Sequence, residues 1–100
     1  MDSQDKELYR EEVLELTDLL NTEWVDLRDL LIENNVNLKG AYMAGYFENE
    51  DDGAEHGIIL TADKKLIKFV ALDGELTLEP VQDQAAIEEE FPSVTVALEL

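Results

Sequence analysis

The chain has 100 residues, of which 45% are hydrophobic, and its 25 acidic residues against 7 basic ones give a formal net charge of −18 at pH 7. A chain of this length fits one domain with a single core, and its hydrophobic fraction is that of a folded protein rather than a disordered one. The charge argues against direct binding of nucleic acid or anionic membranes, and the absence of cysteine excludes disulfides and thiolate metal sites.

The N-terminal residues show no basic segment followed by an apolar one, as a signal peptide would. No apolar run approaches the roughly 20 residues that span a bilayer. We therefore expect a cytoplasmic protein that does not enter a membrane.

Two helices are predicted at the N-terminal end. Over residues 5–20 the apolar side chains recur every three or four residues, which places them on one helical stripe: Tyr9, Val13, Leu16 and Leu20. Thr22 is suited to cap a second helix that runs to about Asn34, with an apolar stripe of Trp24, Leu27, Leu30 and Leu31. One bent helix over residues 5–34 is the alternative, because neither glycine nor proline interrupts the segment.

The central part of the sequence predicts four strands, over residues 39–47, 57–61, 65–72 and 75–79. Asp73-Gly74 between the last two is typical of a type I′ hairpin turn, in which both central residues have positive φ. The first strand is apolar on both faces, which favours a central position in the sheet. Gly40 and Gly45 in that strand indicate a bulge or a close approach of another segment.

The C-terminal part predicts a short helix over residues 83–91, ended by Pro92, and then a strand over residues 93–100, where apolar and polar residues alternate. The whole pattern is that of a single α+β domain over residues 1–100. It comprises two N-terminal helices and then a mostly antiparallel sheet of about five strands, with a short helix before the last strand.

No arrangement of residues indicates catalysis or a bound metal. His56 is the only histidine and reads as a surface or strand-edge residue. The loop from Glu48 to Gly53 places acids at positions 1, 3 and 5 and a glycine at position 6, as in a calcium-binding EF-hand loop, but Ile59 occupies the twelfth position, where a glutamate is needed. We expect a protein that is not an enzyme and that holds no cofactor or metal.

The acidic side chains are concentrated in the two N-terminal helices and in the loop over residues 48–55. Acids four apart on a helix are separated by about 6 Å along its axis, so a row of them presents charge at a spacing similar to that of nucleic-acid phosphates. Small acidic α+β proteins without catalytic residues are typical of immunity proteins, nuclease inhibitors and DNA mimics, an analogy of class rather than of motif. We predict that the chain neutralises a basic partner protein, such as a nuclease or nucleic-acid-binding protein, through Asp26, Asp29, Glu33, Glu48, Glu50, Asp51, Asp52 and Glu55.

The alternative is a small cytoplasmic protein whose acidity serves solubility or salt adaptation. Acids spread evenly over all sides would favour that reading, whereas a coherent negative face beside an exposed aromatic residue such as Trp24, Tyr42 or Tyr46 would favour binding. The sequence leaves the oligomeric state open, since the apolar helix faces suit packing on the sheet or on a second copy.

Overall fold

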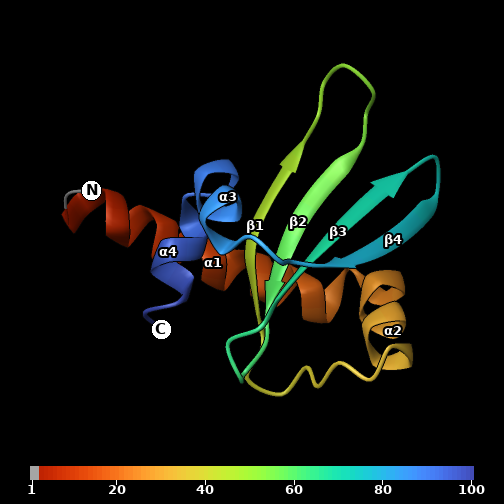
Figure 1. The fold of residues 1–100 in the computed structure, drawn as a ribbon, viewed down its shortest axis with the longest axis horizontal. Coiled ribbons are helices and arrows are strands. Elements are labelled where there is room, and N and C mark those ends of the chain that lie inside the picture. The colour runs from red at the N-terminus through yellow and green to blue at the C-terminus, as the bar shows by residue number, and fades with distance from the viewer. Residues whose placement is uncertain (1–2) are drawn as a thin grey trace.

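The structure is a computed structural model that describes residues 3–100. Two helices, four strands and two short helices follow one another along this part of the chain (Figure 1). Their bounds are α1 Ser3–Thr22, α2 Val25–Glu33, β1 Tyr42–Glu48, β2 Glu55–Leu60, β3 Leu66–Leu72, β4 Glu75–Pro80, α3 Gln84–Glu90 and α4 Ser93–Ala97. The predicted α+β class is confirmed.

The four strands form one antiparallel sheet in the order β1-β2-β3-β4, so each strand pairs with its neighbours in sequence. The predicted hairpin at Asp73-Gly74 is confirmed, since φ is +52° at Asp73 and +80° at Gly74, as a type I′ turn requires. The prediction that the first strand is central was wrong. β1 lies at an edge, and it is apolar on both faces because helices cover it on both sides.

The two N-terminal helices are separate, as the first of the two alternatives predicted. The chain turns at Glu23 and Trp24, whose backbone N–H groups both donate to the carbonyl of Leu19 at the end of α1. The predicted cap was wrong: Trp24 occupies the N-cap of α2, and the Thr22 hydroxyl instead donates to the carbonyl of Asp18. Trp24 is thereby placed at the corner between the helices, facing the sheet.

The predicted fifth strand over residues 93–100 was wrong, because this segment begins with helix α4. The sheet therefore has four strands, and the short helices follow its last strand. Val94 and Ala97 lie three residues apart and both are fully buried, which fits one face of a helix, whereas on a strand they would point to opposite faces. Pro92, with φ −56°, is pre-set for the start of a helix. The preceding helix α3 was predicted correctly, with the Asp83 side chain accepting from the N–H of Ala86 at its start.

Helices cover both faces of the sheet. We call the side packed against the end of α1 and against α2 the α2 face; its buried residues are Leu20, Leu27, Leu31, Ala41, Met43, Ile59 and Phe69. We call the opposite side, packed against α3 and α4, the α4 face; its buried residues are Val13, Ala44, Ile58, Leu60, Leu66, Ile87, Phe91, Val94 and Ala97. α1 contributes to both clusters because it crosses the sheet beside β1 (Figure 1).

Side chains from two helices hold the main chain of β1 at the edge of the sheet. The register between β1 and β2 shifts between Met43 and Gly45, which makes Ala44 a bulge. The N–H of Met43 donates to the Thr17 hydroxyl of α1 at 3.0 Å, and the Ser93 hydroxyl of α4 donates to the carbonyl of Ala44 at 2.6 Å. Polar groups that an edge strand would otherwise expose are thus bonded within the fold.

Gly45, beside the bulge, is where the aromatic ring of Phe91 approaches β1. A Cβ at this position would lie 2.7 Å from Phe91 Cδ1, so the predicted close approach is confirmed. Gly40, the other glycine predicted to be special, has φ +76° in the connection before β1. Gly45 thus leaves room for the Phe91 ring against β1, and Gly40 adopts the positive φ of the turn that leads into β1.

Candidate functional site

A pocket of about 520 Å³ opens on the α2 face, between the corner that joins α1 to α2 and the hairpin ends of the strands. The corner contributes five successive residues, and the sheet contributes residues of β2, β3, β4 and the β3–β4 turn. The lining residues are Glu23, Trp24, Val25, Asp26, Leu27, Glu55, Ala71, Gly74 and Leu76. We refer to this cavity as the Trp24 pocket.

The indole of Trp24 is fixed by two other aromatic rings. Its centroid lies 5.5 Å from that of Tyr46, nearly edge-to-face at 73°, and 5.6 Å from that of Phe69. Phe69 is fully buried in the sheet, whereas Trp24 is only half-buried and part of its ring borders the pocket. The pocket therefore has a rigid aromatic wall that a bound group could contact.

Acidic residues from separate elements line this pocket. Glu23 and Asp26 come from the helix corner, and Glu55 comes from the start of β2. Glu48, at the end of β1, is directly opposite Glu55 in the ladder and so projects from the same face. Like charges at directly opposite positions repel, which makes this arrangement unfavourable for the isolated fold.

The neighbouring negative charge affects the pKa of the Tyr46 phenol. Burial, followed by the charges of Glu55 and Glu48 and a hydrogen bond to Glu55, raises the pKa of Tyr46 above its usual range. The phenol is protonated at neutral pH and is therefore able to donate a hydrogen bond to a neighbouring carboxylate. Tyr46, which contacts Trp24, thus lies within the electrostatic influence of Glu55 and Glu48.

The carboxylates of the Trp24 pocket have no cationic partner within residues 3–100. In this part of the chain the ion pairs with N···O of 4.0 Å or less join Lys6 to Glu99, Lys65 to Asp63 and Lys68 to Glu90. None of these ion pairs involves a residue that lines the pocket.

The structure brings together part of the predicted site. Asp26 and Glu55 line the Trp24 pocket, and Glu48 lies beside Glu55. Asp29 and Glu33 are exposed farther along α2, on the same helical stripe as Asp26 but beyond the pocket lining. Glu50, Asp51 and Asp52 are exposed in the loop between β1 and β2.

The loop between β1 and β2 is ordered by its own side chains. The side-chain oxygen of Asn49 accepts from the N–H of Asp51 at 2.9 Å, and that of Asp52 accepts from the N–H of Ala54 at 2.8 Å. Asp52 therefore acts partly as a turn residue rather than as a free charge. Glu50 and Asp51 remain as the exposed acids of the loop tip.

Glu23 and the apolar floor of the pocket were not predicted. Glu23 falls at the start of the predicted second helix, and Ala71 and Leu76 fall within predicted strands, but none of the three was predicted to bind a partner. The available signal was the acidic sequence around the only tryptophan, Glu23-Trp24-Val25-Asp26, at a predicted helix break. The floor could not be found in this way because it comes from strands about 50 residues away in the chain.

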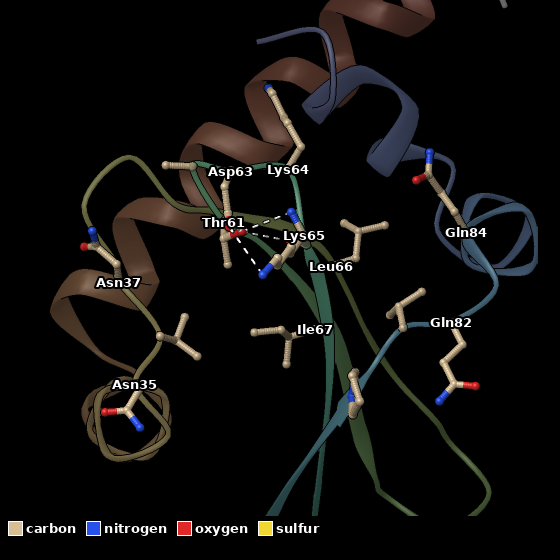
Figure 2. A pocket seen from close by; sticks show the side chains of 14 residues that line it. Asn35, Asn37, Thr61, Asp63, Lys64, Lys65, Leu66, Ile67, Gln82 and Gln84 are labelled. Atoms are coloured by element: carbon tan, nitrogen blue, oxygen red, sulfur yellow. Dashed lines mark hydrogen bonds and ion pairs between the residues drawn. The ribbon is translucent and has the colours of Figure 1, made fainter.

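A second pocket, of about 740 Å³, lies at the opposite end of β3 and is shown in Figure 2. Carboxamides border it on two sides, with Asn35 and Asn37 from the α2–β1 connection and Gln82 and Gln84 from the segment after β4. Thr61 and Lys65 lie between them, where the Thr61 hydroxyl donates to Asp63 and accepts from the N–H of Lys65. Lys64 instead directs its ammonium group to the carbonyls of Leu98 and Leu100. Thr61, Asp63 and Lys65 are thus bonded to one another.

Among residues 3–100 no three histidine, cysteine or acidic side chains are grouped so that they could hold a metal ion. His56 lies on the α4 face, where its ring stacks on Phe47 at a centroid distance of 4.9 Å and an angle of 11°. Its Nδ1 atom is buried without a hydrogen-bond partner.

The described helices include none that is both long enough and apolar enough to traverse a bilayer.

Comparison with protein-family models, with curated proteins and with solved structures found no match to this chain. The functional argument therefore depends on the geometry of the Trp24 pocket.

Proposed function

We propose that this protein is a non-enzymatic binding protein that neutralises a basic partner protein, and that the Trp24 pocket receives a lysine or arginine side chain of that partner. The observation that carries the proposal is that Glu23, Asp26 and Glu55 line one pocket with a half-buried tryptophan and that none of the three is ion-paired within the described chain. A cation over the face of an indole gains about 0.5–2 kcal/mol, more when water is excluded. The carboxylates add charge-assisted hydrogen bonds to the same group.

The exposed acids outside the pocket have a different part in this proposal. Asp29, Glu33, Glu50 and Asp51 extend the negative potential from the pocket along α2 and to the loop tip. Charges of this kind accelerate association with an oppositely charged protein and are screened by salt. We expect them to set the rate of association, while the pocket determines how long the complex lasts.

A basic protein such as a nuclease or a nucleic-acid-binding protein presents the required chemistry, because its nucleic-acid groove is lined by lysine and arginine. Blocking that groove is the means by which an acidic protein of this size would act as an inhibitor or immunity protein. The proposal does not require catalysis by either molecule.

The test compares two variants with the same change in net charge. Asp26→Lys together with Glu55→Lys reverses the pocket, whereas Glu7→Lys together with Glu11→Lys reverses two exposed positions on α1. Basic proteins captured from the source cell are purified, and their association and dissociation rates are measured at about 50 and 500 mM salt. We expect the pocket variant to dissociate at least about tenfold faster, and the α1 variant to change mainly the association rate.

Three results would contradict the proposal. Equal loss of binding in both variants would mean that only net charge matters, which supports the solubility reading of the acidic surface. Binding that is insensitive to salt and to both variants would remove the electrostatic basis. Failure of the wild-type protein to retain any basic protein would remove the proposed partner class.

A further inference from the structure

The outer side of β4 is the uncovered edge of the sheet in the described part of the chain. β4 is the last strand in the order β1-β2-β3-β4, and no helix side chain is bonded to its main chain in the way that Thr17 and Ser93 are bonded to β1. Figure 1 shows β4 on the side of the sheet away from α3 and α4. The two edges of this sheet therefore differ: among the described residues, main-chain groups of β1 are bonded to helix side chains, whereas those of β4 are not.

The hairpin geometry determines which main-chain groups of β4 face outward. In a hairpin with a two-residue turn, the residues that flank the turn form a hydrogen-bonded pair, and bonded and non-bonded pairs then alternate. Leu72 and Glu75 flank the turn, so Thr77 and Glu79 also bond to β3, while Leu76 and Leu78 direct their N–H and carbonyl groups away from it. Two residues thus offer a row of donors and acceptors at the open edge.

The side chains of β4 alternate in character along this row. Glu75, Thr77 and Glu79 are exposed on the α4 face, and Leu76 and Leu78 are half-buried on the α2 face. Leu76 also lines the Trp24 pocket, so the open edge leads directly into the acidic site. An added strand would place its own side chains alternately beside glutamates and beside leucines.

We infer that a basic extended segment of the partner adds to β4 as a fifth, outer strand. This inference rests on the proposed function and specifies how the partner is held. Main-chain bonds to Leu76 and Leu78 provide affinity, as in other cases of strand addition, and side-chain pockets provide selectivity. A lysine or arginine opposite Leu76 projects from the α2 face at the mouth of the Trp24 pocket, while residues opposite Glu75 and Glu79 are basic as well.

The charges of β4 favour a basic strand over a second copy of this chain. Pairing two β4 edges would bring glutamates close to one another, and like charges opposite each other in a sheet are destabilising. Glutamate and proline on an edge strand are also features that prevent edge-to-edge self-association, and β4 has Glu75, Glu79 and Pro80. The same carboxylates that repel an identical edge attract a cationic one.

The experiment uses the full chain and a synthetic peptide of about seven residues, a length typical of one strand, in which pairs of lysines alternate with pairs of valines, so that lysines can lie opposite Glu75, Leu76 and Glu79 at the same time. A second peptide of the same sequence carries N-methyl groups on alternate main-chain amides, which retains the charge but blocks strand pairing on that edge. Binding is followed by NMR hydrogen exchange of individual amides. We expect saturating amounts of the first peptide to slow exchange at Leu76 and Leu78 about tenfold or more, with little change at Thr77, and the methylated peptide to bind at least about tenfold more weakly.

A charge-reversed edge provides the matched control. Glu75→Lys with Glu79→Lys should weaken binding of the unmethylated peptide, whereas Glu7→Lys with Glu11→Lys on α1 should weaken it much less. Equal binding of the two peptides, or protection confined to α2 or to the loop over residues 48–55, would overturn the edge mode and leave the proposed function standing. Concentration-dependent dimerisation of the free protein with protection of β4 would assign the edge to a second copy and also overturn the inference.

The two proposals fail in distinguishable ways. If basic proteins bind and the pocket variant releases them faster, yet β4 remains unprotected, the proposed function holds and strand addition is wrong. If the wild-type chain retains neither a basic protein nor the peptide, both are wrong.

Discussion

Glu48 and Glu55 lie directly opposite each other where β1 and β2 separate into their connecting loop. Burial and then their charges raise the pKa of Tyr46, and no lysine or arginine in residues 3–100 is paired with either carboxylate. A sheet that placed its charges for stability alone would put opposite charges at these positions, as this one does at Lys68 and Glu79. The pair is therefore unfavourable for the isolated fold, and binding of a cationic partner, as proposed above, would relieve the repulsion.

We expect Glu48→Gln to stabilise the protein by a few tenths of a kcal/mol, up to about 1 kcal/mol, because it removes a cross-strand repulsion. The free energy of unfolding from urea denaturation at low salt measures the effect. Glu79→Gln is the control, since it removes an attraction to Lys68 and should be neutral or slightly destabilising. A Glu48→Gln variant less stable than the wild type would show that the repulsion is offset within the fold.

Ser93→Ala should destabilise the protein by about 1–3 kcal/mol, because it leaves the carbonyl of Ala44 without the hydroxyl that now donates to it in a buried setting. Thermal unfolding followed by circular dichroism measures the loss. Thr22→Ala removes an exposed hydroxyl bond to the carbonyl of Asp18 and should have a much smaller effect. Similar effects of the two substitutions would mean that the packing of α4 against β1 does not depend on the hydrogen bond from Ser93 to Ala44.

Gly57→Ala should be strongly destabilising, by about 1–3 kcal/mol or more, since the new methyl group would lie 2.2 Å from Cε1 and 2.3 Å from Cζ of the buried Phe69 ring. Gly53→Ala is a useful comparison, because no atom lies within 4 Å of the new methyl group and only the strain at φ +73° opposes it. Denaturant titration should rank Gly57→Ala well below Gly53→Ala. The reverse order would place Phe69 elsewhere in the core.

The stability of the fold should decrease in alkaline solution because of Tyr46. A folded-state pKa above the unfolded value, which is about 10, means that the folded protein binds the phenolic proton more tightly. Tyr46 therefore contributes stability that is fully present below about pH 10 and is lost as the pH rises through its folded pKa. An NMR titration of the Tyr46 ring signals in the wild type and in Glu55→Gln checks this: the substitution should lower the pKa of Tyr46. An unchanged titration curve would show that Glu55 does not affect the pKa of Tyr46.

Local patterns in the sequence predicted the helices and hairpins well, because Asp73-Gly74 and the apolar stripe of α1 act over a few residues. Residues 93–100 were assigned wrongly because Val94, Val96 and Leu98 satisfy an alternating pattern, while Val94 and Ala97 also satisfy a helical one. Long-range contacts decided between them: Ser93 reaches the carbonyl of Ala44, and the edge of β1 that a fifth strand could have used is occupied.

The candidate site shows the same limit. Asp26, Glu48 and Glu55 could be predicted from charge clustering and loop position. Their grouping around Trp24 could not, because it depends on a turn between two helices lying over a hairpin more than 40 residues away. Where acids lie along the chain is a local property, but which of them face a common cavity depends on the tertiary fold.

The hydroxyls of Thr17 and Ser93, which are bonded to the main chain of β1, have a consequence for the stoichiometry of a complex formed through the sheet. A sheet with two open sides could accept strands at both and so be linked into chains of molecules, whereas here the N–H of Met43 and the carbonyl of Ala44 at the β1 edge are already bonded to helix side chains. Under the strand addition inferred above, we therefore expect each molecule to accept one strand, at β4, and to form a one-to-one complex rather than filaments.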